Sequence, residues 1–157
     1  MTLVSWLGNN MIIGLTLQKN DPIKKSIDYF GMKIGIEWPK GSIRKYANSD
    51  FKKYMYASYG YIKGTTSRDG EEMDVYVNES GLETAKFVYK IRQMSDPKEF
   101  DGEKSWNTFD EFKYMLGFEK MKDAKETYIK CMTKNHFGGI TRMEIKDFKG
   151  AVTRSRD

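Results

Sequence analysis

Short runs of β-branched and aromatic residues, separated by glycine and aspartate, dominate the chain between residues 32 and 92. The runs cover residues 33–38, 55–62, 73–77 and 85–92. Runs of this length and composition are typical of β-strands that are joined by tight turns. The sequence therefore predicts a small, twisted, mostly antiparallel sheet or barrel in this part of the chain.

Two helices are predicted nearer the C-terminus. Apolar residues recur at steps of three and four between residues 120 and 133, which is the spacing of one helix face. Residues 146–152 form a second candidate helix. His136-Phe137-Gly138-Gly139 is interpreted as the turn that ends the first helix, and the charged segment 95–110 as a long loop.

The first 17 residues carry no charged side chain. Gly8-Asn9-Asn10 interrupts this stretch, which is shorter than the ~20 apolar residues of a membrane-spanning helix. It also lacks the basic segment and cleavage site of an export signal. We therefore expect two strands joined by a turn, in a cytoplasmic protein that makes no membrane contact. An apolar hairpin of this kind needs cover, from the rest of the chain or from a second copy in a homo-oligomer.

Asn20-Asp21-Pro22 has the composition of a helix start, a capping side chain followed by proline. Ile23, Ile27 and Phe30 then fall on one helix face, and Gly31 would end the helix. The 157 residues are thus divided into an accessory hairpin and short helix at 1–30, one α+β domain at 31–152 and a flexible tail at 153–157.

The counts of cysteine and histidine restrict the chemistry that the chain can perform. With one residue of each type, the chain has no disulfide framework, no zinc site built on several cysteines and no centre built on several histidines. Any metal must be held mainly by oxygen atoms, which points to a hard cation such as Mg²⁺, Mn²⁺ or Ca²⁺.

The net charge of +5 is concentrated in one segment. Residues 24–53 contain eight basic and three acidic side chains, so this segment holds the whole excess. A basic segment of this kind attracts phosphate, whether on nucleic acid, on a small phosphorylated ligand or on a lipid head group. A solvated, lysine-rich surface that keeps the chain soluble is the alternative interpretation.

Three acids, Asp69, Glu71 and Asp74, leave a glycine turn and enter a predicted strand. Side chains on a strand alternate between its faces, so Asp69 and Glu71 would share one side, and the twist of the turn can bring Asp74 near them. Clustered carboxylates repel one another unless a cation neutralises them, and their oxygen atoms suit Mg²⁺. Solvated loop acids are the alternative.

Several blocks of the sequence resemble the soluble, family I inorganic pyrophosphatases. Tyr59-Gly60-Tyr61-Ile62 is followed by Asp69-Gly70-x-x-x-Asp74-Val75-x-Val77, where the family has Tyr-Gly-x-Ile and then Asp-Gly-Asp-Pro-x-Asp-Val. Upstream, Glu37-Trp38-Pro39 is similar to a Glu-Ile-Pro strand, and the segment 40–45 lies where the family places basic residues that bind phosphate.

The chain also resembles a pyrophosphatase-like domain that is found in polyvalent proteins of phages and conjugative elements. The block at 109–118, Phe-Asp-Glu-Phe-Lys-Tyr-Met-Leu-Gly-Phe, is similar to one of that domain's conserved blocks. The resemblance spans residues 31–148 and leaves the first thirty residues outside it. It implies a cytoplasmic location in a phage host, or a place in a virion.

The resemblance implies a small five-stranded, OB-like β-barrel with flanking C-terminal helices, and hydrolysis of inorganic pyrophosphate or a related phosphoanhydride with Mg²⁺ or Mn²⁺. Catalytic roles would fall to Glu71, Lys113 and Tyr59. The phosphate would be bound by Arg44, Lys45, Tyr59 and Lys113. The metal would be held by Asp69, Asp74, Asp110, Glu111 and Glu37.

The sequence departs from the family pattern at two places. Glu71 stands where the family has aspartate, one methylene shorter, and a ~1 Å error in placing a general base can cost about 10²-fold in rate. A further loop aspartate of the family has only Asp96 and Asp101 as loose counterparts. These departures favour an alternative: a catalytically silent copy of the fold that serves as a phage or mobile-element binding or structural protein.

Overall fold

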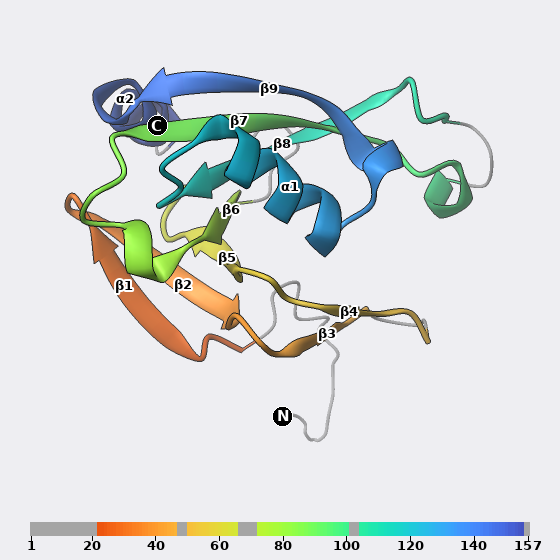
Figure 1. Cartoon of the computed structure of the whole chain (residues 1–157), viewed down its shortest axis with the longest axis horizontal. Helices are drawn as coiled ribbons and strands as arrows, with labels where there is room; N and C mark the ends of the chain where they lie inside the picture. The colour runs from red at the N-terminus through yellow and green to blue at the C-terminus, as the bar shows by residue number, and fades with distance from the viewer. Residues whose placement is uncertain (1–21, 47–49, 66–71, 101–103, 156–157) are drawn as a thin grey trace, which may run out of the picture.

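The computed structural model describes residues 22–46, 50–65, 72–100 and 104–155. A seven-stranded sheet runs through the molecule in the order β1-β2-β5-β6-β8-β7-β9 (Figure 1). Its strands are β1 (Lys25–Tyr29), β2 (Met32–Trp38), β5 (Ser58–Ile62), β6 (Met73–Val77), β8 (Phe109–Leu116), β7 (Phe87–Met94) and β9 (Phe137–Glu144). All neighbouring strands of this sheet are antiparallel except β6 and β8, which are parallel.

A second, two-stranded sheet is made by β3 (Ile43–Lys45) and β4 (Lys52–Tyr54). The two α-helices are α1 (Met121–Cys131) and α2 (Ile145–Ser155). Short 3₁₀ turns occur at Glu79–Gly81, Pro97–Phe100 and Lys134–His136. In the described part of the chain, no helix has the length and hydropathy needed to span a membrane.

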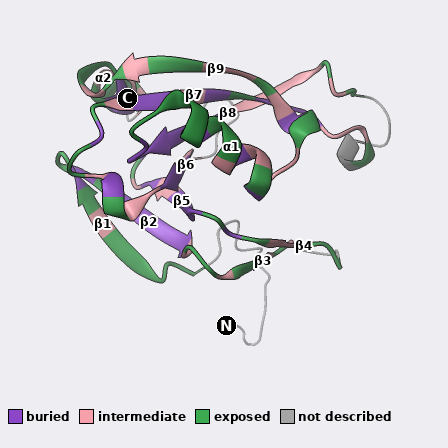
Figure 2. Ribbon diagram, viewed as in Figure 1, coloured by how far each residue is buried: buried purple, intermediate pink, exposed green. Residues whose placement is uncertain are grey.

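The alternation of side chains along the strands gives the large sheet two apolar faces. On β6, Val75 and Val77 pack in one cluster with Phe148 of α2, whereas Tyr76 packs in another with Tyr128 of α1. Both helices contact β7 and β9, and Figure 2 shows the strands buried where the helices cover them. We call these two sides the α2 face and the α1 face. Each helix therefore covers one side of the sheet.

The sheet is larger than the expected five-stranded barrel. Residues 109–116 and 137–144 are strands, although the sequence analysis placed their first residues in a loop and in a turn. The run of charged residues at the start of β8 and the two glycines of β9 hide the alternation that predicts a strand. A Cβ atom at Gly138 would lie 2.3 Å from the Met94 Sδ atom, so this glycine serves close packing inside the sheet.

The predicted short helix before Gly31 is wrong, because this segment is the strand β1. Phe30 and Gly31 have φ angles of 52° and 85°, and they form the two-residue turn of a β1–β2 hairpin. Glycine suits this turn as well as a helix end, so the sequence signal was ambiguous. The division of the chain at residue 30 falls in this turn. The predicted strands within residues 1–17 lie outside the described residues.

The other predictions agree with the structure to within a few residues. The strand predicted at 73–77 is β6, and that predicted at 33–38 is β2 with one residue added. The helices predicted at 120–133 and 146–152 are α1 and α2.

Candidate active site

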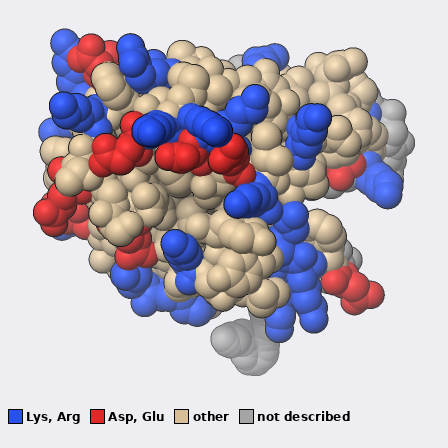
Figure 3. Space-filling view, in the orientation of Figure 1, with Lys and Arg blue, Asp and Glu red and all other residues tan. Residues whose placement is uncertain are grey.

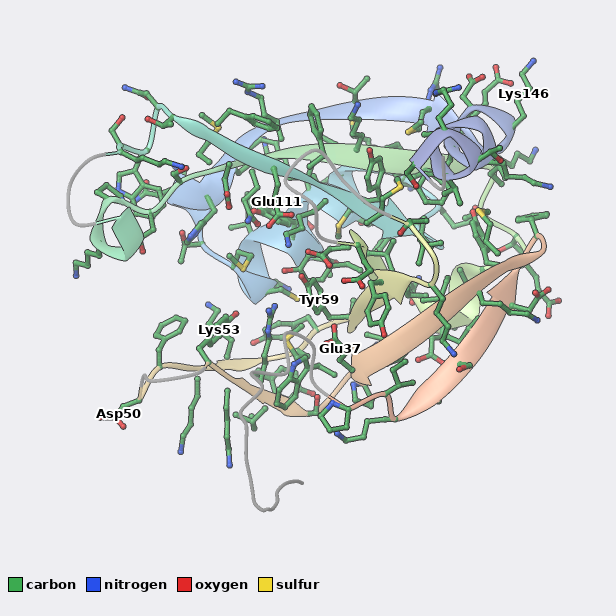
Figure 4. All side chains as sticks on the ribbon, turned by 180° about the vertical axis from the view of Figure 1, so that it is seen from behind. Glu37, Asp50, Lys53, Tyr59, Glu111 and Lys146 are labelled. Carbon is green, nitrogen blue, oxygen red and sulfur yellow. The ribbon has the colours of Figure 1, made fainter. Side chains whose placement is uncertain are left out.

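Lys113 of β8 lies at the centre of a buried polar cluster on the α1 face. Only 5% of this residue is exposed. Its Nζ atom donates a hydrogen bond to the Tyr59 hydroxyl at 2.9 Å and another to Asp74 Oδ2 at 2.6 Å. Glu111 Oε2 lies 3.1 Å from the same nitrogen. We call Tyr59, Asp74, Glu111 and Lys113 the lysine cluster; Glu111 and Tyr59 are labelled in the middle of the molecule in Figure 4.

The sheet order explains why these four residues meet. Tyr59 comes from β5, Asp74 from β6, and Glu111 and Lys113 from β8, and these three strands are neighbours. Lys113 and Glu111 are two residues apart, so they point to the same face of β8. Gly60, next to Tyr59, allows β5 to approach β2, because a Cβ atom there would lie 1.8 Å from the Gly35 carbonyl oxygen.

The charges of the lysine cluster interact strongly because the cluster is buried. Burial lowers the pKa of Lys113, but Tyr59, Asp74 and Glu111 outweigh this effect and hold its pKa well above its usual range. Burial raises the pKa of Glu111, and the charges of Asp74 and Asp110 raise it further against the opposing effect of Lys113. Burial also raises the pKa of Tyr59 to about 12. At neutral pH the cluster therefore contains a fixed ammonium ion and a neutral phenol.

Arg44 of β3 reaches the edge of the lysine cluster. Its guanidinium carbon lies 4.2 Å from the centre of the Tyr59 ring and 4.7 Å from that of Tyr46. Such stacking over aromatic rings stabilises a partly desolvated guanidinium. The adjacent Lys45 points to the opposite, exposed face of β3, as alternation requires. Of these two neighbouring basic residues, both predicted to bind phosphate, the structure therefore brings only Arg44 to the cluster.

Asp110 is placed by an irregularity in the pairing of β7 with β8. Gln93 pairs with Glu111 and Met94 pairs with Phe109, so Asp110 is the extra residue of a β-bulge. A bulge interrupts the alternation of side chains and re-aims one of them. Asp110 Oδ2 accepts a hydrogen bond of 3.0 Å from Gln93 Nε2.

Glu37 is the extra residue of a second bulge, between β2 and β5. Ile36 pairs with Gly60 and Trp38 with Tyr59, which leaves Glu37 between the two pairs. The Glu37 side chain is buried. Burial raises the pKa of Tyr61, two residues along β5 from Tyr59, and the charges of Glu37 and Glu72 raise it further.

Gln93 and Tyr128 were not predicted from the sequence. The Tyr128 hydroxyl of α1 donates a hydrogen bond of 2.6 Å to Gln93 Oε1, so a buried chain runs from α1 through Gln93 to Asp110. Tyr128 lies in the helix that was predicted at 120–133, but no sequence signal links a glutamine to a carboxylate 17 residues away. We infer that Gln93 and Tyr128 fix the orientation of Asp110.

Removing the Tyr128 hydroxyl should destabilise the protein. Tyr128→Phe leaves the buried Gln93 Oε1 atom without its donor, which costs about 1–3 kcal/mol of unfolding free energy. Tyr76→Phe is the matched control, because the Tyr76 hydroxyl is buried without a hydrogen-bond partner among the described residues. This control should be neutral or stabilising. Urea denaturation measures both, and an equal loss in the two variants would contradict the inferred chain of hydrogen bonds.

The side chains described at this site provide only part of the ligands that a hard cation needs. Asp74 and Glu111 offer carboxylate oxygen atoms, the ligands that Mg²⁺ prefers, from two neighbouring strands. Asp110 is adjacent in sequence to Glu111. No group of three or more acidic, histidine or cysteine residues in metal-binding geometry occurs among the described residues. Asp69 and Glu71, two further predicted site residues, lie outside them.

Comparison with known proteins places these observations in a family. The family model described as Inorganic Pyrophosphatase matches residues 17–153, a range that includes β1. No curated protein matches the chain. Among solved structures, an inorganic pyrophosphatase from Coxiella burnetii is similar with 13% sequence identity and a TM-score of 0.39, over 85% of this chain and 90% of that chain. Because the family match covers most of its residues, this chain belongs to the inorganic pyrophosphatase family.

Proposed function

We propose that this chain hydrolyses inorganic pyrophosphate to phosphate. The observation that carries the proposal is the lysine cluster, in which a buried ammonium ion lies against carboxylates from two parallel strands. Burying ionised groups is costly, and buried groups with perturbed pKa values and specific charged partners cluster at functional sites. The lysine cluster lies inside the range that matches the family.

Two cations of the site are suited to bind the substrate. We propose that Arg44 binds the phosphate groups through the N–H donors of its guanidinium. Lys113 would attract them by its positive charge, because its three N–H donors face Tyr59, Asp74 and Glu111. Tyr59 lies between the two cations, 2.9 Å from Lys113 and beneath the Arg44 guanidinium. With a raised pKa its hydroxyl stays neutral and can donate a hydrogen bond.

The carboxylates have a separate role. We propose that Asp74, Asp110 and Glu111, with Asp69 and Glu37, hold Mg²⁺ or Mn²⁺, and that Glu71 accepts the proton of the attacking water. A divalent cation supplies Lewis acidity, which lowers the pKa of water and offsets the charge of the leaving phosphate. Lys113 keeps the Asp74 and Glu111 carboxylates close together before a cation binds.

A catalytically silent protein is the second candidate. Glu71 in place of aspartate favours it, since the longer side chain moves the carboxylate of the proposed base. The mobile-element resemblance is consistent with such a binding or structural role. In either case we propose that the apolar segment at 3–17 packs on the rest of the chain or on a second copy in a homo-oligomer.

Release of phosphate from pyrophosphate tests the proposal. The wild-type protein should release phosphate with Mg²⁺ or Mn²⁺ and not with EDTA, and either ion should raise the melting temperature because it binds the folded state. Glu71→Gln should lower the rate about 10²–10⁴-fold, as for loss of a general base. Glu71→Asp should retain or increase it. Activity that appears only in Glu71→Asp would instead support the silent protein, and no activity in either would overturn the proposal.

A further inference from the structure

The hairpin formed by β3 and β4 extends away from the large sheet. Its strands belong to a separate two-stranded sheet, and Figure 1 shows the hairpin extending below the large sheet. At its base, backbone hydrogen bonds join Gly41 N to Met55 O at 2.8 Å and Met55 N to Ser42 O at 2.9 Å. Most of the hairpin is drawn as exposed in Figure 2. It is therefore a well-formed arm whose outer side is open to solvent.

The two faces of the hairpin differ in burial. Residues that are directly opposite on antiparallel strands share a face, and the three pairs here are Ile43 with Tyr54, Arg44 with Lys53, and Lys45 with Lys52. Arg44 and Lys53 are partly buried and form the inner face, toward the lysine cluster. The other four residues are exposed. We call Ile43, Lys45, Lys52 and Tyr54 the outer face.

Like charges are paired across the hairpin. Two of its three cross-strand pairs join cations, and such pairs destabilise a sheet unless an anion neutralises them. No ion pair involving Lys45, Lys52 or Lys53 occurs within the described ranges. Figure 3 shows basic side chains gathered along this arm, and Figure 4 shows Asp50, an acid, at its end. The arm is thus arranged to attract an anion that the described residues do not supply.

Exposed aromatic rings accompany these charges. Phe51, Tyr54 and Tyr56 are 52%, 45% and 45% exposed, and they are three of the four strongly exposed aromatic residues in the described part of the chain. The rings of Tyr54 and Tyr56 are 4.7 Å apart, edge to face. Phe51 lies on the inner side of the hairpin, where it contacts Lys53 and Tyr46. Lys130 of α1 lies over Tyr56. Alternating cations and exposed rings provide contacts for both phosphates and bases.

We propose that the outer face of the β3–β4 hairpin, together with Tyr56, binds single-stranded nucleic acid. Lysines neutralise backbone phosphates and aromatic rings stack on unpaired bases, so the combination selects single strands. A duplex keeps its bases stacked within the helix and would leave the rings without partners. An anionic membrane would use the lysines but would not require edge-to-face rings spaced along a strand.

This binding site is separate from the site of pyrophosphate hydrolysis, although one hairpin serves both. Arg44 on the inner face contacts Tyr59 of the lysine cluster, whereas its neighbour Lys45 faces outward. Nucleic-acid binding needs neither pyrophosphate nor a divalent cation. Its test can therefore fail or succeed whether or not the chain is an enzyme.

Fluorescence anisotropy with labelled oligothymidine and oligouridine, without divalent cations, tests the proposal. The oligonucleotides should exceed the ~4–16 nucleotides that such a site covers. Binding is expected to weaken steeply between about 50 and 200 mM salt. The double variant Lys45→Gln, Lys52→Gln should reduce the slope of log K against log salt by about 1.4, or ~0.7 for each lost phosphate contact. Tyr54→Ala should weaken binding about tenfold and leave the slope unchanged.

The matched control removes the same charge from the opposite end of the molecule. Lys146 and Lys149 are exposed on α2, and Figure 4 shows Lys146 far from Lys53. The double variant Lys146→Gln, Lys149→Gln should bind as the wild type does, and circular dichroism should confirm that all variants are folded. A preference for one oligonucleotide identifies DNA or RNA as the partner and supports the proposal. The proposal would be overturned if the wild type bound no oligonucleotide, or if the Lys146→Gln, Lys149→Gln control lost as much affinity as the hairpin variants. Equal affinity for a duplex, or binding only to phosphatidylserine vesicles, would overturn it too.

Discussion

Lys113→Met is expected to destabilise the protein by about 3–5 kcal/mol, the usual cost of removing one partner from a buried ion pair. The lysine contacts Asp74 and Glu111, whose side chains are each only 21% exposed. Methionine fills a similar volume, so the loss reports the uncompensated carboxylates rather than a cavity. Urea denaturation at neutral pH measures the change in unfolding free energy.

Lys146→Met is the control for this variant. The Lys146 amino group lies 3.8 Å from Glu144, and both side chains are highly exposed. Removing this amino group should therefore change the unfolding free energy by close to zero. A small effect at Lys113, equal to that at Lys146, would contradict the buried ion pair.

The stabilising effect of Lys113 should also depend on pH. Because its pKa in the folded protein is raised, the folded state retains this proton at pH values where the unfolded state loses it. The stabilising contribution of Lys113 is therefore fully present below pH 10.5, the pKa of lysine in the unfolded chain. It declines as the pH rises from there through the higher pKa of Lys113 in the folded protein. The gap in stability between wild type and Lys113→Met should narrow when denaturation is repeated above pH 10.5.

Asp74→Asn is expected to lower the rate of pyrophosphate hydrolysis at least about 10²-fold. The substitution preserves size but removes the charge that holds Lys113 at 2.6 Å and that would help to bind the divalent cation. Both the position of the ammonium that would attract the phosphate groups and the neutralisation of the leaving group would suffer. The measurement is kcat/KM for phosphate release at saturating Mg²⁺.

Asp28→Asn provides the comparison for Asp74→Asn. Asp28 pairs with Lys33 at 3.1 Å on the β1–β2 hairpin, where both side chains are largely exposed and lie far in sequence from the lysine cluster. It should leave the rate unchanged. An Asp74→Asn enzyme that is folded and as active as the wild type would show that Asp74 has no part in the reaction.

The sequence predicted those elements whose pattern is local. β6 alternates along its length, and α1 carries apolar residues at helical spacing, so both were predicted nearly to the residue. β8 was missed because charged residues interrupt its first half: Asp110 occupies a bulge, and Glu111 and Lys113, which follow it, form a buried ion pair. The alternation of side chains that marks a strand can be recognised in a sequence only when every residue on one face of the strand is apolar.

The candidate site could be predicted only in part, and for a different reason. Tyr59, Asp74, Glu111 and Lys113 were proposed from a family resemblance, and the structure brings these four together. Resemblance alone could not separate Arg44, which faces the cluster, from Lys45, which faces solvent. Gln93 and Tyr128 could not be found, since their role depends on contacts between elements that are distant in sequence.

The parallel pairing of β6 with β8 determines when the lysine cluster can form during protein synthesis. Asp74 and Lys113 are 39 residues apart, and the intervening chain must return along the sheet before the strands can pair. At about 5–20 residues per second, a ribosome adds those residues in about 2–8 seconds. For that time Asp74 and Tyr59 have been synthesised and their lysine has not. Non-local pairings of this kind also slow folding itself, toward the millisecond-to-second range. The cluster therefore cannot assemble until β8 has been synthesised, and a chain that stops before β8 contains Asp74 without the lysine that neutralises it.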